Sequence, residues 1–138
     1  MTHWSTPYIG LPYLNHGRDR AGCDCWGLVV LVYRECLGIE LPSYAGDYVS
    51  TDERGEIAEL IAHHREVGPW QSVEDPREFD VAIFRRGPHA SHAGIVVRPG
   101  SMLHVPFDQA RIEDYRRGQW APRLTGIYRH VERTSKVL

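Results

Sequence analysis

Five short runs of β-favouring residues fill the second half of this chain, whereas helical spacing is confined to the first half. All five runs follow Pro76 and are bounded by turn residues. They lie at residues 81–84, 92–97, 102–105, 111–112 and 126–131. Helices followed by a mostly antiparallel sheet are typical of an α+β fold, in which the helices pack on the sheet. We therefore predict an α+β fold.

Two segments of the first half have helical spacing. In the stronger one, apolar side chains recur at i, i+3, i+4 and i+7, which is typical of a helix with one buried face. They are Cys25, Leu28, Val29, Val32, Tyr33 and Cys36. Asp24 is a favoured N-cap residue, and Gly38 stands where a glycine commonly ends a helix. A second helix is predicted over 53–67, with Ser50 and Glu53 as a capping box.

Length and composition fit one globular domain. The 138 residues are 42% hydrophobic and 25% charged, so we expect a single domain over residues 1–138. The 16 basic residues are scattered and face 18 acidic ones, which argues against a nucleic-acid partner. No apolar run approaches the roughly 20 residues that span a bilayer, and the first residues lack a secretory signal. We expect synthesis in the cytoplasm and no membrane insertion.

The three cysteines, Cys23, Cys25 and Cys36, are close together in the sequence. An odd number clustered in this way is a poor disulfide framework. On a helix with about 1.5 Å rise per residue, Cys25 and Cys36 lie roughly 16 Å apart, too far for a disulfide. At least one thiol is therefore expected to be free.

Cys25 is a candidate nucleophile because it opens the helix that Asp24 caps. The partial positive charge and the unpaired amides of a helix N-terminus stabilise a thiolate. The same amides, especially that of Cys25, can hold an oxyanion that forms on an attacked carbonyl. Cys25 also fits a second role, that of a small apolar residue on the buried helix face. Position alone does not separate the two roles.

A thiol nucleophile needs a base, and His92 at the start of the 92–97 strand is the best candidate. His104 on the next strand can fix the tautomer of His92, as the third member of a catalytic triad does. Gly94 has no side chain and would let another element, such as the helix of Cys25, approach His92. A strict two-residue turn at Pro99-Gly100 would place the two histidines on opposite faces. We therefore predict a bulge or an odd-length loop between them.

The other polar candidates have weaker patterns. The cysteines lack the paired spacing of a zinc site, so we expect no metal and no cofactor. Asp24 and Asp80 fit a helix cap and a strand start better than an acid pair. The remaining histidines have no partner that the sequence identifies. They include His63, His64, His89 and His130.

Several motifs together resemble the NlpC-type papain-like cysteine peptidases. Residues 22–29 (GCDCWGLV) resemble the nucleophile motif of that family, and residues 92–97 (HAGIVV) resemble its catalytic-histidine strand. Residues 8–13 (YIGLPY) look like its entry segment, and residues 102–104 match the segment that carries the third polar residue. The motifs occur in the order of the family and span most of the chain.

This resemblance implies a papain-like fold and a peptidase site. By resemblance, Cys25 is the nucleophile, His92 the base and His104 the orienting residue. Asp24 and Tyr13 would surround the oxyanion and the catalytic groups, and Trp26 would line the substrate cleft. The implied activity is hydrolysis of a peptide or amide bond in bacterial cell-wall stem peptides. The Cys25 thiolate attacks the carbonyl, His92 protonates the departing amine, and water then clears the acyl-enzyme.

The doubled cysteine of residues 22–25, with residues 33–35 (YRE), looks most like a branch of the family encoded in phage and prophage tails. That branch includes tail-associated peptidases of lambda-like phages and of gene transfer agents. It implies a virion component that binds tail-tip or hub proteins. Such a protein would reach the cell wall or periplasm of the host during DNA entry, without a signal of its own.

Two departures from the family pattern accompany these motifs. Many family members have paired glycines where this chain has His16-Gly17, and Gly-Asp where it has Phe79-Asp80. Both positions lie beside the motifs and bear on the substrate more than on activity.

Other functions remain open from the sequence. The chain would be a structural tail-tip assembly protein if it kept the peptidase fold without cleaving anything. A different reaction at the same triad, either amidase cleavage nearer the sugar or acyl transfer as in the lecithin-retinol acyltransferase group, is a further alternative. In that group the Cys-His pair lies on a rearranged fold, whereas here the cysteine precedes both histidines, as in the peptidases.

Overall fold

A computed structural model of the chain describes residues 3–41, 69–86 and 89–132. The helix predicted over 53–67 lies outside the described residues. Within the described part, no helix is both long and apolar enough to cross a membrane.

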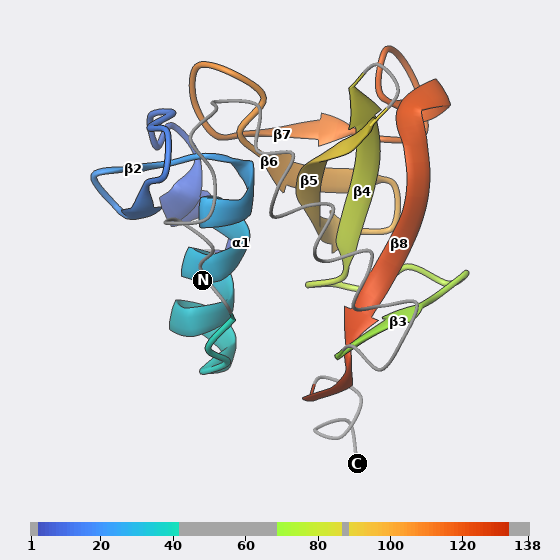
Figure 1. The fold of residues 1–138 in the computed structure, drawn as a ribbon, viewed down its shortest axis with the longest axis horizontal. Coiled ribbons are helices and arrows are strands. Elements are labelled where there is room, and N and C mark those ends of the chain that lie inside the picture. The colour runs from blue at the N-terminus through green and yellow to red at the C-terminus, as the bar shows by residue number, and fades with distance from the viewer. Residues whose placement is uncertain (1–2, 42–68, 87–88, 133–138) are drawn as a thin grey trace.

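A six-stranded antiparallel sheet forms one layer of the molecule, and α1 packs against it (Figure 1). The spatial order of the strands is β3-β8-β4-β5-β6-β7. Their bounds are Trp70–Ser72 (β3), Val81–Arg86 (β4), His89–Arg98 (β5), Ser101–His104 (β6), Arg111–Asp114 (β7) and Leu124–His130 (β8). All five β runs found in the sequence are therefore strands, and the α+β prediction is confirmed. β3 was missed because its three residues carry no alternating pattern.

The helical segment begins and ends where the sequence predicts. Asp24 has extended backbone, and its side chain accepts a hydrogen bond from the amide of Gly27, as an N-cap does. α1 runs over Cys25–Val32, and a π-helical turn, η2 (Tyr33–Leu37), continues it. Gly38 then adopts the left-handed conformation that ends the helix.

The described residues ahead of α1 pack on the core. They form a 3₁₀ turn, η1 (Thr6–Tyr8), followed by a two-stranded ribbon of β1 (Arg18–Asp19) and β2 (Gly22–Cys23). The hydroxyl of Tyr8 donates to Glu35 of η2 at 2.7 Å. Burial and the hydrogen bonds to Cys36 and Glu35 raise the pKa of Tyr8 well above its usual range.

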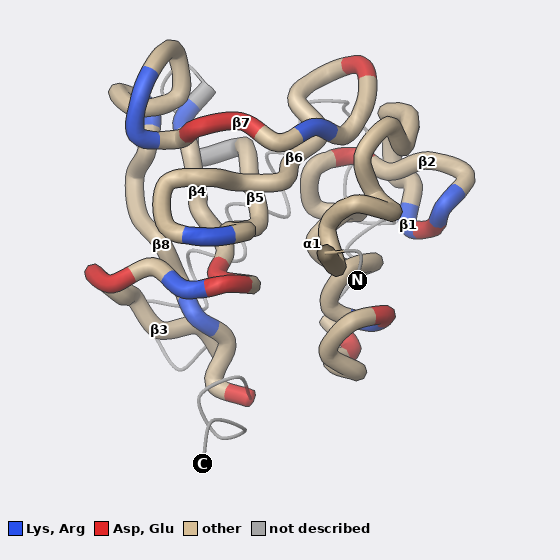
Figure 2. The backbone as a smooth tube through the Cα atoms, turned by 180° about the vertical axis from the view of Figure 1, so that it is seen from behind, with Lys and Arg blue, Asp and Glu red and all other residues tan. Residues whose placement is uncertain are grey.

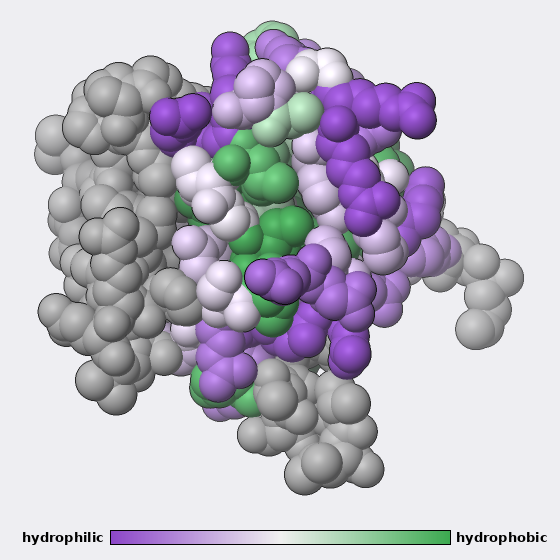
Figure 3. All heavy atoms as spheres, turned by 90° about the vertical axis from the view of Figure 1, so that its right-hand side faces the viewer, coloured by the Kyte–Doolittle hydropathy of each residue, from purple (hydrophilic) through white to green (hydrophobic). Residues whose placement is uncertain are grey.

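The sheet buries apolar side chains on both faces. One cluster joins α1 to the inner face through side chains such as Ala93, Ile95 and Leu103. A second cluster lies on the outer face and includes Phe84, Trp120 and other residues. Figure 3 looks onto the side away from α1 and shows apolar side chains framed by hydrophilic ones. In Figure 2 the charged segments lie in the loops and along the sheet, whereas α1 carries none.

Candidate active site

The two predicted histidines are hydrogen-bonded to each other. Nε2 of His92 on β5 lies 2.8 Å from Nδ1 of His104 on β6, and both side chains are fully buried. A bulge places them on one face. The β5–β6 register shifts between Val96 and Arg98, so that Ile95 pairs with Leu103. The predicted irregularity between the histidines is therefore confirmed.

Gly94 makes room for this pairing, although its neighbour is not the one expected. A Cβ at Gly94 would lie 2.6 Å from the sulfur of Met102 and 3.4 Å from Cβ of His104. The missing side chain therefore lets β6, not the helix of Cys25, come close. The prediction about the helix was wrong because Gly94 lies on the sheet face opposite Ala93 and Ile95, which pack with α1.

Glu113 on β7 is a functional candidate that the sequence analysis missed. Its Oε2 lies 2.6 Å from Nε2 of His104, so that three side chains on three adjacent strands form one chain of hydrogen bonds. Met102 pairs with Glu113 in the β6–β7 register, so Glu113 lies diagonal to His104 on the same face. The sequence predicts a β run over residues 111–112 only. Extending it by two residues would have placed Glu113 beside the histidines.

The order of hydrogen bonds fixes where the protons lie when both rings are neutral. A carboxylate only accepts, so Nε2 of His104 carries a proton and donates it to Glu113. Nδ1 of His104 is then the acceptor, and Nε2 of His92 is the donor to it. Nδ1 of His92 is therefore the basic atom, and it is the ring nitrogen that can take a proton from a nucleophile.

Trp120 packs directly on this chain of side chains. Its ring stacks on His92 with centroids 4.7 Å apart and planes inclined by 21°. It meets His104 edge-on at 5.1 Å, and Phe84 lies 6.0 Å from His92 on another side. These aromatic rings hold the imidazoles in place and keep water from them.

Cys25 is the first residue of α1, and α1 packs against β5, the strand of His92. Its side chain is buried in the inner cluster. No disulfide involves Cys23, Cys25 or Cys36, which confirms the prediction of a free thiol.

Asp24 stabilises the start of α1 through several buried hydrogen bonds. Its carboxylate accepts the amide of Gly27 at 2.8 Å, the amide of His16 at 2.9 Å and Nη1 of Arg18 at 2.7 Å. A Cβ at Gly27 would lie 1.9 Å from the carbonyl oxygen of Gly17, so a glycine is required there. The cap role predicted for Asp24 is confirmed. Its contacts hold the N-terminus of α1 against the preceding segment.

The structure places Tyr13 and Trp26 in different settings. Tyr13 is half-buried beside the inner cluster, and its backbone bridges to Cys23 just ahead of α1. Trp26 is 1% exposed and meets Trp70 edge-on at 6.3 Å. Trp26 is therefore a core residue in this structure, and a place in the substrate cleft stays a prediction.

Asp80, expected at a strand start, directly precedes β4 and forms a buried ion pair. Its two carboxylate oxygens accept Nε and Nη2 of Arg129 at 2.9 and 2.8 Å. The hydrogen bond to Asp80 raises the pKa of Arg129. This pair joins β4 to β8 and lies apart from the histidines.

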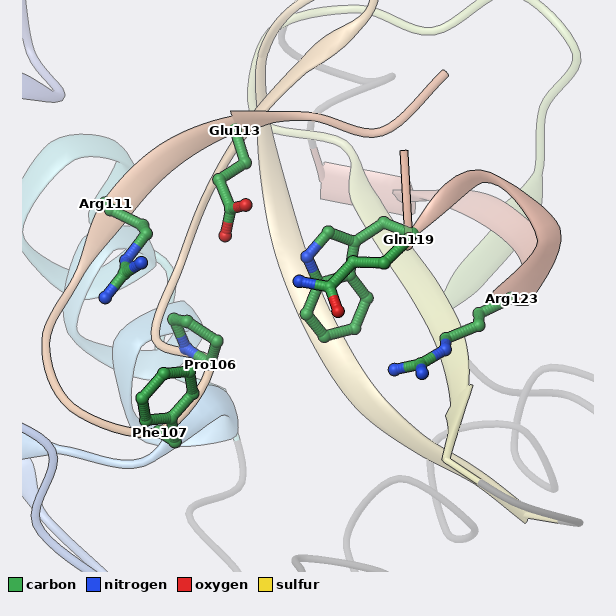
Figure 4. A pocket seen from close by; sticks show the side chains of 7 residues that line it. Pro106, Phe107, Arg111, Glu113, Gln119 and Arg123 are labelled. Carbon is green, nitrogen blue, oxygen red and sulfur yellow. The ribbon is translucent and has the colours of Figure 1, made fainter. Parts of the chain in front are cut away.

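A pocket of about 320 Å³ opens beside the histidines. It reaches them through Glu113, which bonds His104, and Trp120, which stacks on His92. Figure 4 shows Phe107, Arg111 and Glu113 on one side and Gln119 and Arg123 on the other. The full lining is Pro106, Phe107, Arg111, Glu113, Gln119, Trp120 and Arg123.

Known proteins share this sequence pattern. A gamma-DL-glutamyl hydrolase of Bacillus subtilis (strain 168) is 29% identical over 124 residues, which cover 88% of this chain and 27% of that protein. A murein DD-endopeptidase/murein LD-carboxypeptidase of Escherichia coli (strain K12) is 29% identical over 96 residues, 70% of this chain and 43% of that protein. Tail tip assembly protein K of Escherichia phage N15 is 28% identical over 123 residues, 88% and 51% of the two chains. The chain thus spans about a quarter to a half of these curated relatives.

Solved structures share the fold. The NlpC/P60 domain of the peptidoglycan hydrolase SagA superposes with a TM-score of 0.62 at 20% identity, over 91% of this chain and 92% of that one. A Staphylococcus aureus (Mu50) protein of the NLP/P60 family gives a TM-score of 0.68 at 21% identity, over 93% of this chain and 39% of that one. The NlpC/P60 family model matches residues 10–129. The chain belongs to the NlpC/P60 family, a family of cysteine peptidases and peptidoglycan hydrolases.

Proposed function

We propose that this protein is a cysteine peptidase that hydrolyses an amide bond in peptidoglycan stem peptides. Cys25 is the nucleophile, His92 the base and His104 the residue that orients it. Residues 1–138 act as one catalytic unit. The observation that carries the proposal is the hydrogen-bonded chain from His92 through His104 to Glu113, because it leaves Nδ1 of His92 basic. Family membership and the name of one relative, a murein DD-endopeptidase, support the same activity.

The chemistry follows from this order of protons. Nδ1 of His92 takes the thiol proton of Cys25, and the thiolate attacks the substrate carbonyl carbon. The backbone amide of Cys25, at the start of α1, donates to the oxyanion. His92 then gives its proton to the departing amine as the C–N bond breaks, which leaves a thioester. A water molecule, deprotonated by His92, hydrolyses the thioester and releases the thiol.

Glu113 acts as a positioning residue in this scheme. Its carboxylate holds the proton of His104 on Nε2, and through it the proton of His92 on Nε2. The negative charge of Glu113, at the end of this chain of hydrogen bonds, also stabilises the imidazolium that forms during attack. Asp24 supports the start of α1 as its N-cap, and the backbone of Tyr13 bridges to Cys23 just ahead of it.

Hydrolysis is tested with purified protein and purified peptidoglycan. Mass spectrometry of the soluble fragments is expected to show stem-peptide cleavage by the wild-type protein and none by Cys25→Ala or His92→Ala. The product masses identify the bond and separate peptidase from amidase cleavage nearer the sugar. Fragment release by Cys25→Ala at the wild-type rate would contradict the proposed nucleophile.

The protein acts, we propose, as part of a phage or prophage tail, bound to tail-tip or hub proteins. The doubled cysteine motif and the 28% identity to the tail protein of phage N15 support this placement. Tagged protein is expected to co-sediment with tail particles induced in the source strain. Its absence from the particles would contradict the virion placement and leave the hydrolase proposal standing. A catalytically silent tail-tip protein would be found in the particles, yet it would cleave nothing.

A further inference from the structure

We propose that Arg18 is a positioning residue for the nucleophile, because its guanidinium neutralises the buried carboxylate of Asp24 and so lets the start of α1 stabilise the thiolate of Cys25. This inference rests on the proposed function and deepens it, since it concerns how the same thiol is activated. Arg18 lies on β1, six residues before Asp24 and outside every motif that the sequence analysis singled out.

Asp24 has to meet two opposing requirements. Its fully buried carboxylate accepts the backbone amides of Gly27 and His16, and these hydrogen bonds stabilise the start of the helix. The same negative charge belongs to the residue directly before Cys25, and a nearby like charge disfavours a thiolate. A carboxylate without a counter-charge would therefore offset the favourable effect of the helix N-terminus on the thiolate.

Arg18 supplies the compensating charge. Its Nη1 donates to Oδ1 of Asp24 at 2.7 Å and to the carbonyl oxygen of Gly17 at 2.8 Å. The Arg18 side chain is 13% exposed, so water and salt screen this ion pair only weakly. The two charges cancel, while the carboxylate keeps its hydrogen bonds to the amides at the start of α1.

The guanidinium of Arg18 also lies against the first turn of α1. A Cβ at Gly27 would lie 2.8 Å from Nη1 of Arg18 and 3.0 Å from Oδ1 of Asp24. Gly27 follows Cys25 by two residues, so the positive charge lies beside the turn that carries the nucleophile. Strand β1 contacts α1, and the two elements lie side by side in Figure 2. This placement adds to the partial positive charge of the helix N-terminus.

Other charged groups surround α1 as well. The elements that contact it are β1, β2, β5 and η2. The base proposed for the reaction, His92, lies on β5, whereas η2 continues α1 at the end opposite Cys25. The further titratable or charged side chains that the structure describes on these elements are Asp19, Cys23, Tyr33, Arg34, Glu35, Cys36 and Arg98.

The test measures the pH at which Cys25 loses its proton. Carbon NMR of protein labelled at the cysteine Cβ atoms follows the thiols separately and requires no reagent to reach a buried side chain. His92→Gln is the background, so that Cys25 titrates without the proposed base. In this background Arg18→Gln is expected to raise the pH midpoint of Cys25 by about one unit, as for an uncompensated charge several ångströms away at an effective dielectric constant of about 20.

Two further variants separate charge from structure. Asp24→Asn keeps a good N-cap residue and leaves the charge of Arg18 alone, so it is expected to lower the midpoint. The double variant Arg18→Gln/Asp24→Asn restores neutrality and is expected to return the midpoint to the background value. A merely structural role of Arg18 predicts no such return, because the double variant has lost the ion pair. Arg18→Lys keeps the charge and is expected to keep the midpoint, which covers the case in which Arg18→Gln does not fold.

Arg20→Gln is the matched control. Arg20 lies two residues after Arg18, and its charge is paired with Glu35 of η2 at 2.8 Å. The substitution is expected to leave the midpoint of Cys25 unchanged. The inference is overturned if Arg18→Gln has no effect, if Arg20→Gln has the same effect, if the double variant stays shifted, or if Arg18→Lys moves the midpoint by a full unit. Failure of the peptidase proposal has a different signature, because the wild-type protein would then release no stem-peptide fragments, whatever the midpoints.

Discussion

Nε2 of His104 lies 2.6 Å from Oε2 of Glu113, and this contact ends a hydrogen-bond chain that starts at His92. The Glu113 side chain is about one quarter exposed, whereas His104 is fully buried. The pair therefore connects a buried imidazole to the edge of the pocket. In the proposed mechanism His104 orients His92, and the carboxylate behind His104 fixes which of its nitrogens carries the proton.

Glu113→Gln is expected to lower kcat/KM for stem peptides by roughly 10²-fold, within the usual contribution of acid-base positioning. A carboxamide can donate as well as accept, so it no longer fixes the proton of His104 on Nε2. Nitrogen NMR of the imidazoles is expected to show the Nε2–H tautomer of His104 in the wild type and a mixture in the variant. Glu113→Asp restores the charge and is expected to recover part of the activity.

Asp114→Asn is the control for that experiment. Asp114 is the next residue of β7, its side chain is 50% exposed, and the substitution removes the same charge. It is expected to leave activity and tautomers unchanged. An equal loss in both variants would mean that Glu113 acts through net charge alone.

Asp80→Asn is expected to lower the free energy of unfolding by about 3 kcal/mol, because it leaves Arg129 without its charge partner inside the sheet. Asp80 is 1% exposed and also accepts the amide of Arg77 at 2.8 Å. Urea unfolding measures the change as a lower midpoint at constant slope. Asp108→Asn removes an exposed ion pair with Arg111 and is expected to have little effect. Similar losses in the two variants would refute the buried-pair argument.

Much of the site was predictable because it lies on regular elements. Period-two alternation placed His92 on a strand, and the need for both histidines to face one way predicted a bulge or an odd-length loop between them. The structure has the register shift between Val96 and Arg98. Asp24 and Gly38 marked the helix ends through chemistry that acts within a few residues. These features depend on local sequence.

Contacts between distant segments were not predictable in the same way. Trp120 lies 28 positions after His92, in a loop before β8, and no periodicity links the two. Glu113 was missed because residue propensities define strand ends poorly. Extending the period-two pattern by one more pair of residues would have included it. Tertiary packing determines that Trp120 and Glu113 both lie against the histidines.

His16→Gly is expected to raise the free energy of unfolding by about 1 kcal/mol, since His16 has a left-handed φ of 65°. Its backbone amide bonds Asp24 with either residue present. Phe79, with a φ of 74°, is the other non-glycine residue with a left-handed backbone in the described part of the chain.

Phe79→Gly is the matched contrast, and it is expected to destabilise the fold by about 2 kcal/mol despite relief of the same strain. The ring of Phe79 is 7% exposed and stacks on Trp4, with centroids 4.3 Å apart. The melting temperatures of the two variants compare the stability gained by relief of backbone strain with the stability lost when a buried ring is removed. A lower melting temperature for His16→Gly would show that contacts of the imidazole outweigh the strain.

Stability is expected to fall as the pH drops from 7 toward 5, in part through His130. Burial lowers the pKa of His130 below its ordinary value of 6.5 and outweighs the charge of Glu132, which acts in the opposite direction. The unfolded chain therefore binds a proton below pH 6.5 that the folded chain resists, so the stability present above that pH is lost on acidification. Trp70 and Tyr33 face the ring, and the amide of Glu132 donates to its Nδ1 at 3.1 Å, which favours the neutral form. His130→Gln cannot titrate, so urea midpoints measured at pH 7 and pH 5 should differ less for this variant than for the wild type. An unchanged difference would assign the pH dependence to other groups.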